Sequence, residues 1–114
     1  MRKIYILGPM RGVPYYNFPA FDEAAEKLRD AGYEPISPAD IDRECGFDPS
    51  SLPSDFDWNT IPESLDLKEI MTRDLLAIIT EADGYHCLLG WGRSQGARAE
   101  QAVCKWKGIP EVGL

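Results

Sequence analysis

Two carboxyl groups stand where the sequence pattern calls for apolar side chains. Asp74 lies four residues after Ile70 and four before Ile78, so it projects from the apolar side of a predicted helix. A buried carboxylate costs free energy unless it is hydrogen-bonded or paired. Asp74 is therefore either one half of an ion pair, with Arg73 or Arg98 as its partner, or a functional acid whose pKa is raised by burial.

Glu100 repeats this pattern on the next predicted helix. Its neighbours at helical spacing are all small or apolar: Gly96, Ala97, Val103 and Cys104. This face of the helix is expected to pack toward a sheet, near the carboxyl end of a strand, where open α/β folds bind their ligands. Glu100 is therefore either a carboxylate that interacts favourably with the helix dipole or a group that faces a ligand.

A glycine-rich turn, GWGRSQG at 90–96, leads into the helix that carries Glu100. Its glycines are Gly90, Gly92 and Gly96. They either serve only the turn or let a ligand approach the backbone, with Ser94 and the free N–H groups of the helix binding an anion. A second short turn, GPMRG at 8–12, follows the first predicted strand and carries Arg11. We expect the two preceding strands to be neighbours, which places Arg11 near Ser94.

The elements that must position these residues alternate between strands and helices. Strands are predicted at 3–8, 33–37, 84–90 and 109–114, and Pro35 makes the second of them an edge strand. Helices are predicted at 18–33, 64–83 and 94–108. The apolar stripe of the middle helix is predicted to contain Leu67, Ile70, Met71, Leu75, Ile78, Ile79 and Ala82. This alternation predicts an α/β fold with a parallel sheet and right-handed crossovers.

One long segment, 38–63, shows no period. It is rich in Pro, Ser and Asp, and Phe47, Phe56 and Trp58 are interleaved. A loop of this length in a small domain is usually functional or disordered. We expect a loop whose aromatic side chains either order it as a lid or simply pack on the body of the domain.

Composition and charge exclude several classes of function. The net charge of −7 argues against binding to a nucleic acid polymer, which depends on Lys and Arg. No apolar run approaches the roughly 18 residues that span a bilayer, so we expect no membrane partner. The 3 cysteines show no CxxC spacing, which argues against a disulfide framework and against a zinc site. The single histidine, His86, lies in a predicted strand and has either a structural or a catalytic role.

Three segments in this order, IYILGPMRG (4–12), RDLLAIITEADGYHCLLG (73–90) and SQGARAEQA (94–102), resemble the nucleoside 2-deoxyribosyltransferase superfamily. The resemblance extends to its 2′-deoxynucleoside 5′-phosphate N-hydrolases, and is closer still to a branch of uncharacterised domains, DUF4406. It implies one domain over 1–114, a flavodoxin-like or Rossmann-like three-layer sandwich with a small parallel sheet and helices on both faces. It also implies a homodimer or higher homo-oligomer in the cytoplasm of a bacterial or phage-infected cell.

The resemblance also assigns roles to individual residues. Glu100 matches the nucleophile that attacks C1′ of the deoxyribose, and Asp74 matches the acid that protonates or positions the leaving base. Tyr5 matches the aromatic residue that orients the nucleophile, and Ser94 matches the serine that binds the 5′-phosphate in the hydrolases. The remaining substrate-binding residues are expected in the two turns and the long segment: Gly8, Met10, Arg11, Gly12, Gly90, Gly96 and Asp40.

We therefore expect an enzyme that hydrolyses or transfers at the N-glycosidic bond of a 2′-deoxyribonucleoside 5′-monophosphate, without a metal or cofactor. This reaction passes through an oxocarbenium-like state and needs two carboxyl groups in different environments. The alternative is a nucleotide-binding or nucleotide-sequestering module without turnover. Family members often extend past the last strand, whereas this chain ends at Leu114, and the segment 38–63 is expected to replace that contribution, with Asp40 and Asp42 as contacts to the base or a sugar hydroxyl.

Overall fold

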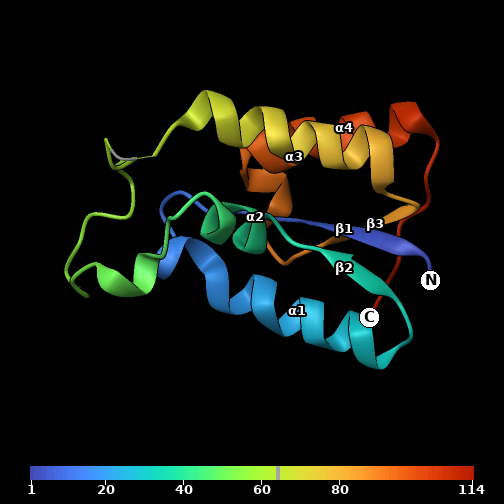
Figure 1. Cartoon of the computed structure of the whole chain (residues 1–114), viewed down its shortest axis with the longest axis horizontal. Helices are drawn as coiled ribbons and strands as arrows, with labels where there is room; N and C mark the ends of the chain where they lie inside the picture. Colours follow the sequence, from blue (N-terminus) through green and yellow to red (C-terminus); the bar gives the residue numbers. More distant parts are fainter. Residues whose placement is uncertain (64) are drawn as a thin grey trace.

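The computed structural model describes residues 1–63 and 65–114 and shows a parallel sheet of three strands (Figure 1). The strands are β1 (Lys3–Leu7), β2 (Glu34–Ile36) and β3 (Gly84–Cys87), in the order β2-β1-β3. The strands predicted at 3–8, 33–37 and 84–90 are thus present, each slightly shorter than predicted. β2, which contains Pro35, is an edge strand as predicted. The order β2-β1-β3 is that of the first three strands of flavodoxin-like folds. In those folds the strand order reverses between β1 and β3, and ligands bind at that point.

Helices cover both faces of the sheet. Ile4 and Ile6 of β1 pack with α1 (Phe18–Asp30) on one face. Tyr5 and Leu7 alternate to the other face, where they pack with α3 (Leu67–Glu81) and α4 (Gln95–Lys107). Figure 1 shows α1 below the sheet and the α3–α4 pair above it. The prediction of an α/β sandwich with a small parallel sheet is therefore confirmed.

The segment 38–63 is not the uninterrupted loop that we predicted. Residues Pro38–Glu44 form a helix, α2, and Pro49–Ser51 form a 3-10 turn. A helix of seven residues is too short to show a hydrophobic period, which is why the pattern missed it. α2 begins just after β2 and contacts both α1 and α3, so it lies at the carboxyl end of the sheet (Figure 1).

The aromatic side chains of this segment pack on the body of the domain. Trp58 is 8% exposed, and its ring centroid lies 5.2 Å from that of Tyr16 and 4.9 Å from that of Tyr15. Phe47 and Phe56 join the same cluster. The structure therefore favours packing over a lid as the role of these aromatics.

Two further details differ from the predictions. Ile70, Ala77 and Ile78 of α3 are buried, but Leu67, Met71 and Ile79 are exposed, since a three-stranded sheet covers only part of the stripe. The segment 109–114 forms a single parallel bridge, Tyr85 to Glu111, instead of a strand.

In the described residues, no helix is both long enough and apolar enough to cross a membrane.

Candidate functional site

A hydrogen bond between two elements far apart in sequence marks the centre of the site. The hydroxyl of Tyr5 donates to Oε2 of Glu100 over 2.5 Å. Tyr5 is fully buried on the central strand, and alternation along β1 turns it toward α4. Glu100 lies on the face of α4 that also carries the buried residues Ala97 and Cys104. The sheet therefore fixes the position of the hydroxyl, and the hydroxyl fixes the carboxyl group.

The surroundings of Glu100 shift its pKa toward neutral pH. Burial raises the pKa of Glu100 to about 7, the hydrogen bond from Tyr5 opposes this rise, and the charge of Asp42 adds to it. Burial also raises the pKa of Tyr5 well above its usual value, with Glu100 and Asp74 adding to the effect. Tyr5 is therefore neutral and acts as a hydrogen-bond donor, which leaves Glu100 as the acceptor.

Asp74 is buried without the ion pair that one interpretation of the sequence predicted. It is 8% exposed, and within the described residues its Oδ1 has no hydrogen-bond partner. The guanidinium of Arg73 instead lies 3.9 Å from Glu69 and 2.9 Å from the sulfur of Cys45. The pKa of Asp74 is raised to about 8, first by burial and then by the charges of Glu100 and Asp42. The interpretation of Asp74 as an ion pair is therefore wrong.

A third buried carboxyl group, Asp42 of α2, acts on these two; our sequence analysis named it, with Asp40, as a contact to the base or a sugar hydroxyl, and did not connect it with Asp74. Asp42 is 4% exposed, and burial raises its pKa to about 7. Its charge acts on both Asp74 and Glu100. Within the sequence PADIDRE, Pro38 and Ala39 lie four and three positions before Asp42, a spacing that places all three on one face of a helix. This spacing could have indicated that Asp42 is buried, but only if the segment had been known to be helical.

The turn before α4 has the conformation that its glycine requires. Gly90 has a φ of +85°, and a Cβ added there would lie 3.7 Å from Pro9, so the turns after β1 and β3 are adjacent. Ser94 is the N-cap of α4, and its Oγ accepts a hydrogen bond of 3.2 Å from the N–H of Ala97. Gly96 is exposed in the first turn of the helix. This arrangement leaves Ser94 and the start of α4 beside the turn that follows β1.

In the turn at 8–12, packing explains the two glycines. A Cβ on Gly8 would lie 2.7 Å from the Cβ of Leu88, so glycine is needed for the close approach of β1 and β3. Gly12 has a φ of +84°, and its N–H donates to the carbonyl of Trp58 over 2.8 Å. That N–H is therefore already engaged within the protein. Met10, also in this turn, packs against the core on the α1 side.

Arg11 and Asp40 are not among the groups whose charges act on the pKa of Glu100. Arg11 is exposed, and its charge acts on Tyr16. Asp40 pairs with Arg43 over 3.1 Å. The structure thus brings Tyr5, Asp74 and Glu100 together, but it directs Asp40 elsewhere.

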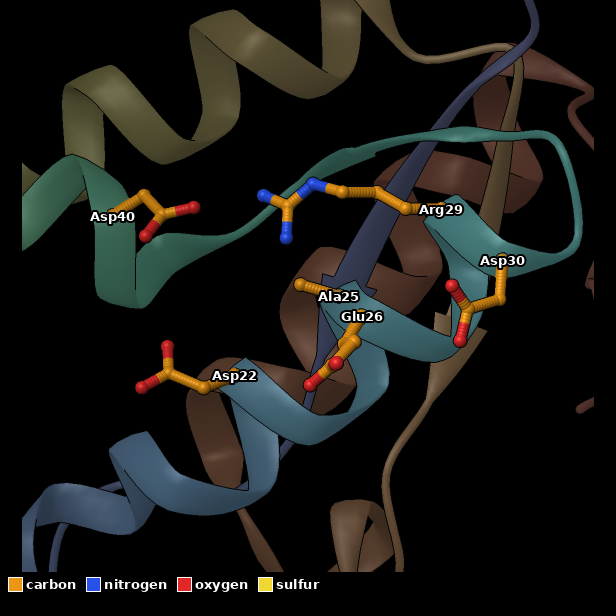
Figure 2. Close-up of a pocket in the computed structure, with 6 residues that line it drawn as sticks. All are labelled: Asp22, Ala25, Glu26, Arg29, Asp30 and Asp40. Atoms are coloured by element: carbon orange, nitrogen blue, oxygen red, sulfur yellow. The ribbon is translucent and has the colours of Figure 1, made fainter.

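Asp40 lines a surface hollow of about 500 Å³ between α1 and α2. The other lining residues are Asp22, Ala25, Glu26, Arg29 and Asp30. Figure 2 shows Arg29 extending from α1 toward the carboxyl group of Asp40 across this hollow. The hollow contains none of the residues around Glu100, so the prediction that Asp40 and Glu100 share a site finds no support in the structure.

His86, the single histidine, has a structural partner. Nδ1 of His86 lies 2.7 Å from the carbonyl oxygen of Val112, a contact that ties β3 to the C-terminal segment. Among the described residues, no group of three or more His, Cys, Asp or Glu side chains has an arrangement that could hold a metal ion. The groups that the site presents are the carboxyl groups of Asp42, Asp74 and Glu100 and the hydroxyl of Tyr5.

Replacing Tyr5 with Phe removes the hydroxyl that donates to Glu100 and keeps the ring in the core. We expect the pKa of Glu100 to rise by roughly one unit or more, because a hydrogen bond to a charged group contributes about 1.5–3 kcal/mol. A ¹³C NMR titration of the Glu100 carboxyl carbon measures the change. Tyr85→Phe is the matched control, since Tyr85 lies opposite Tyr5 in the sheet register and its hydroxyl meets Gln101. Equal shifts in the two variants would contradict the prediction.

Comparison with known proteins agrees with part of the resemblance seen in the sequence. The model of a family described as a domain of unknown function (DUF4406) matches residues 2–112. No curated protein and no solved structure gives a significant match to the chain. The matched range includes β1, α3 and α4, the elements that carry Tyr5, Asp74 and Glu100. The chain therefore belongs to the DUF4406 family.

Proposed function

We propose that this protein cleaves the N-glycosidic bond of a 2′-deoxyribonucleoside 5′-monophosphate, with Glu100 as the nucleophile at C1′. The observation that carries the proposal is the 2.5 Å hydrogen bond from Tyr5 to Glu100, together with the buried carboxyl group of Asp74, whose Oδ1 has no hydrogen-bond partner among the described residues. A carboxylate that is held in one orientation beside a neutral acid is the arrangement that this bond cleavage needs.

The two carboxyl groups divide the work according to their surroundings. The pKa of Asp74 is raised to about 8 and that of Glu100 to about 7, so Glu100 ionises first and Asp74 retains its proton near neutral pH. In the proposed step, a Glu100 oxygen forms a bond to C1′ while the C1′–N bond breaks. The electron pair of that bond goes to the base, which takes the proton of Asp74. Water, or a second base, then displaces the Glu100 carboxylate from C1′ and gives up a proton to Asp74, which restores both carboxyl groups.

The proposed phosphate contact lies at the start of α4. Ser94 and the first N–H groups of this helix can bind an anion, and the helix dipole favours negative charge there. The adjacent turn after β1 approaches Gly90 closely. A 5′-monophosphate bound at Ser94 would place its sugar between this turn and Glu100, about one and a half helical turns further along α4.

The proposal is tested with a panel of 2′-deoxynucleoside 5′-monophosphates and the corresponding nucleosides, followed by chromatography for free base. We expect base release from at least one monophosphate and at least about tenfold less from its nucleoside. Ser94→Asp keeps a good helix cap but adds a negative charge. The KM for the monophosphate should therefore rise at least about tenfold in this variant, with little change for the nucleoside.

Two outcomes would count against the proposal. Release of no base from any compound by the folded protein would exclude the enzyme. If calorimetry then showed a monophosphate bound and recovered intact, the protein would instead be a binding module. Equal use of nucleoside and monophosphate, unchanged by Ser94→Asp, would exclude the phosphate contact alone.

A further inference from the structure

Asp42 is an unexplained buried acid. Its Oδ1, like that of Asp74, has no hydrogen-bond partner in the described part of the chain. The two residues come from α2 and α3, which are in contact, and they are 4% and 8% exposed. A buried carboxyl oxygen without a partner costs free energy, so two of them on helices that contact each other require an explanation. Of these two aspartates, the proposed reaction uses only Asp74.

We propose that Asp42 is a positioning residue, whose carboxylate keeps the proton on Asp74 while Glu100 is ionised for attack on C1′. The inference rests on the proposed function and adds to it a group from an element outside the segments that carry the family resemblance.

The surroundings of Asp74 are negative on every side from which a charged group faces it. The charges of Glu100 on α4 and of Asp42 on α2 both raise the pKa of Asp74, while β1 contributes the neutral hydroxyl of Tyr5. Arg73 is the next residue on α3, but its guanidinium is directed to Glu69 and Cys45. Ionisation of Asp74 would therefore add a third negative charge to the cluster.

The surroundings of Asp42 favour its ionisation before that of Asp74. The neighbouring Arg43 lowers the pKa of Asp42, although its guanidinium is directed to Asp22 on α1 at 2.7 Å and to Asp40 at 3.1 Å. For Asp74, the charges that act on its pKa are those of carboxyl groups. With Asp42 and Glu100 ionised, the shared proton remains on Asp74, the group that must donate it to the leaving base.

The experiment follows the Asp74 carboxyl carbon by ¹³C NMR titration in the wild type, in Asp42→Asn and in Asp40→Asn. Asp40 is the matched control because it lies on the same helix, two residues away, and pairs with Arg43 at the surface. We expect the Asp74 midpoint to fall by about one pH unit in Asp42→Asn and to stay in place in Asp40→Asn. The apparent pKa on the alkaline side of the pH profile of base release should fall by about the same amount. Asp42→Asn should therefore lose activity several-fold at pH 8 relative to its own optimum.

Several outcomes would overturn the inference. The titration midpoint of Asp74 could be the same in Asp42→Asn as in the wild type, or it could move equally in Asp42→Asn and Asp40→Asn. If Asp42→Asn does not fold, the wild-type curves decide, because coupled carboxyl groups titrate in two steps whereas independent single steps exclude the coupling. Base release is read separately from the titration. If the wild type releases no base, the catalytic role falls with the proposed function, whereas an unmoved midpoint in an active enzyme overturns the inference alone.

Discussion

Glu100→Gln is expected to lower base release from a 2′-deoxynucleoside 5′-monophosphate by at least about a thousandfold, the scale of loss when a nucleophile is removed. The amide keeps the size of the side chain and can still accept the hydrogen bond from Tyr5, but it cannot form the bond to C1′. We expect kcat to fall and KM to change little, because the substitution leaves the proposed phosphate contact at Ser94 intact. Chromatography for free base and a full set of initial rates measure both constants.

Glu44→Gln is the matched control for this loss. Glu44 is an exposed glutamate at the last position of α2, so the same chemical change there should leave base release within about twofold of the wild type. Circular dichroism and the urea midpoint of Glu100→Gln should show that the variant is folded. If a folded Glu100→Gln released base at the wild-type rate, Glu100 would not be the nucleophile.

The second large effect concerns stability and requires no substrate. The pKa of Asp74 is raised from 3.8 to about 8 in the folded protein, mainly by burial, so the folded state holds a proton that the unfolded state releases at lower pH. The free energy of unfolding should therefore be highest below about pH 4 for this group and should fall as the pH rises from about 4 to 8. Asp42 and Glu100, whose pKa values are raised to about 7, change stability in the same direction.

Asp74→Asn removes the share of this pH dependence that belongs to Asp74. We expect the variant to gain stability relative to the wild type as the pH rises, with the difference growing by roughly 2–5 kcal/mol between about pH 4 and pH 8. Urea unfolding at pH 4.5, 6.5 and 8 measures it. Asp55→Asn, a change at an exposed aspartate of the 38–63 segment, should leave the difference nearly constant. A constant difference for Asp74→Asn would show that Asp74 is not held protonated by the fold.

Asp74 and Glu100 were predictable from the sequence because their placement depends on local geometry. Helical spacing alone shows which side chains share a face with apolar neighbours, whatever the rest of the chain does. The alternation of strands and helices likewise predicted the parallel sheet. The hydrogen bond between Tyr5 and Glu100 joins residues 95 positions apart, and only the family resemblance indicated it in advance.

Asp40 and Asp42 show where sequence reasoning failed. Both lie in a segment without a visible period, and they are two residues apart. In a helix this separation turns them to different sides, so Asp40 faces the hollow beside α1 and Asp42 is buried near Asp74. A seven-residue helix depends on tertiary contacts for its existence, and no local pattern specifies those contacts. The sequence analysis therefore named both aspartates and could not distinguish their positions.

β1 is the central strand, paired with β2 and with β3, and it carries the hydroxyl that holds Glu100. Amide hydrogens in such a strand exchange with solvent only when the whole domain unfolds, whereas a single short helix packed at the end of a sheet can open by itself. We therefore expect Tyr5, the hydroxyl partner of Glu100, to lie on the slowest-exchanging element, and Asp42 to lie on a helix that opens at a lower free energy. Brief opening of α2 would admit water to Asp74 while leaving the bond between Tyr5 and Glu100 in place.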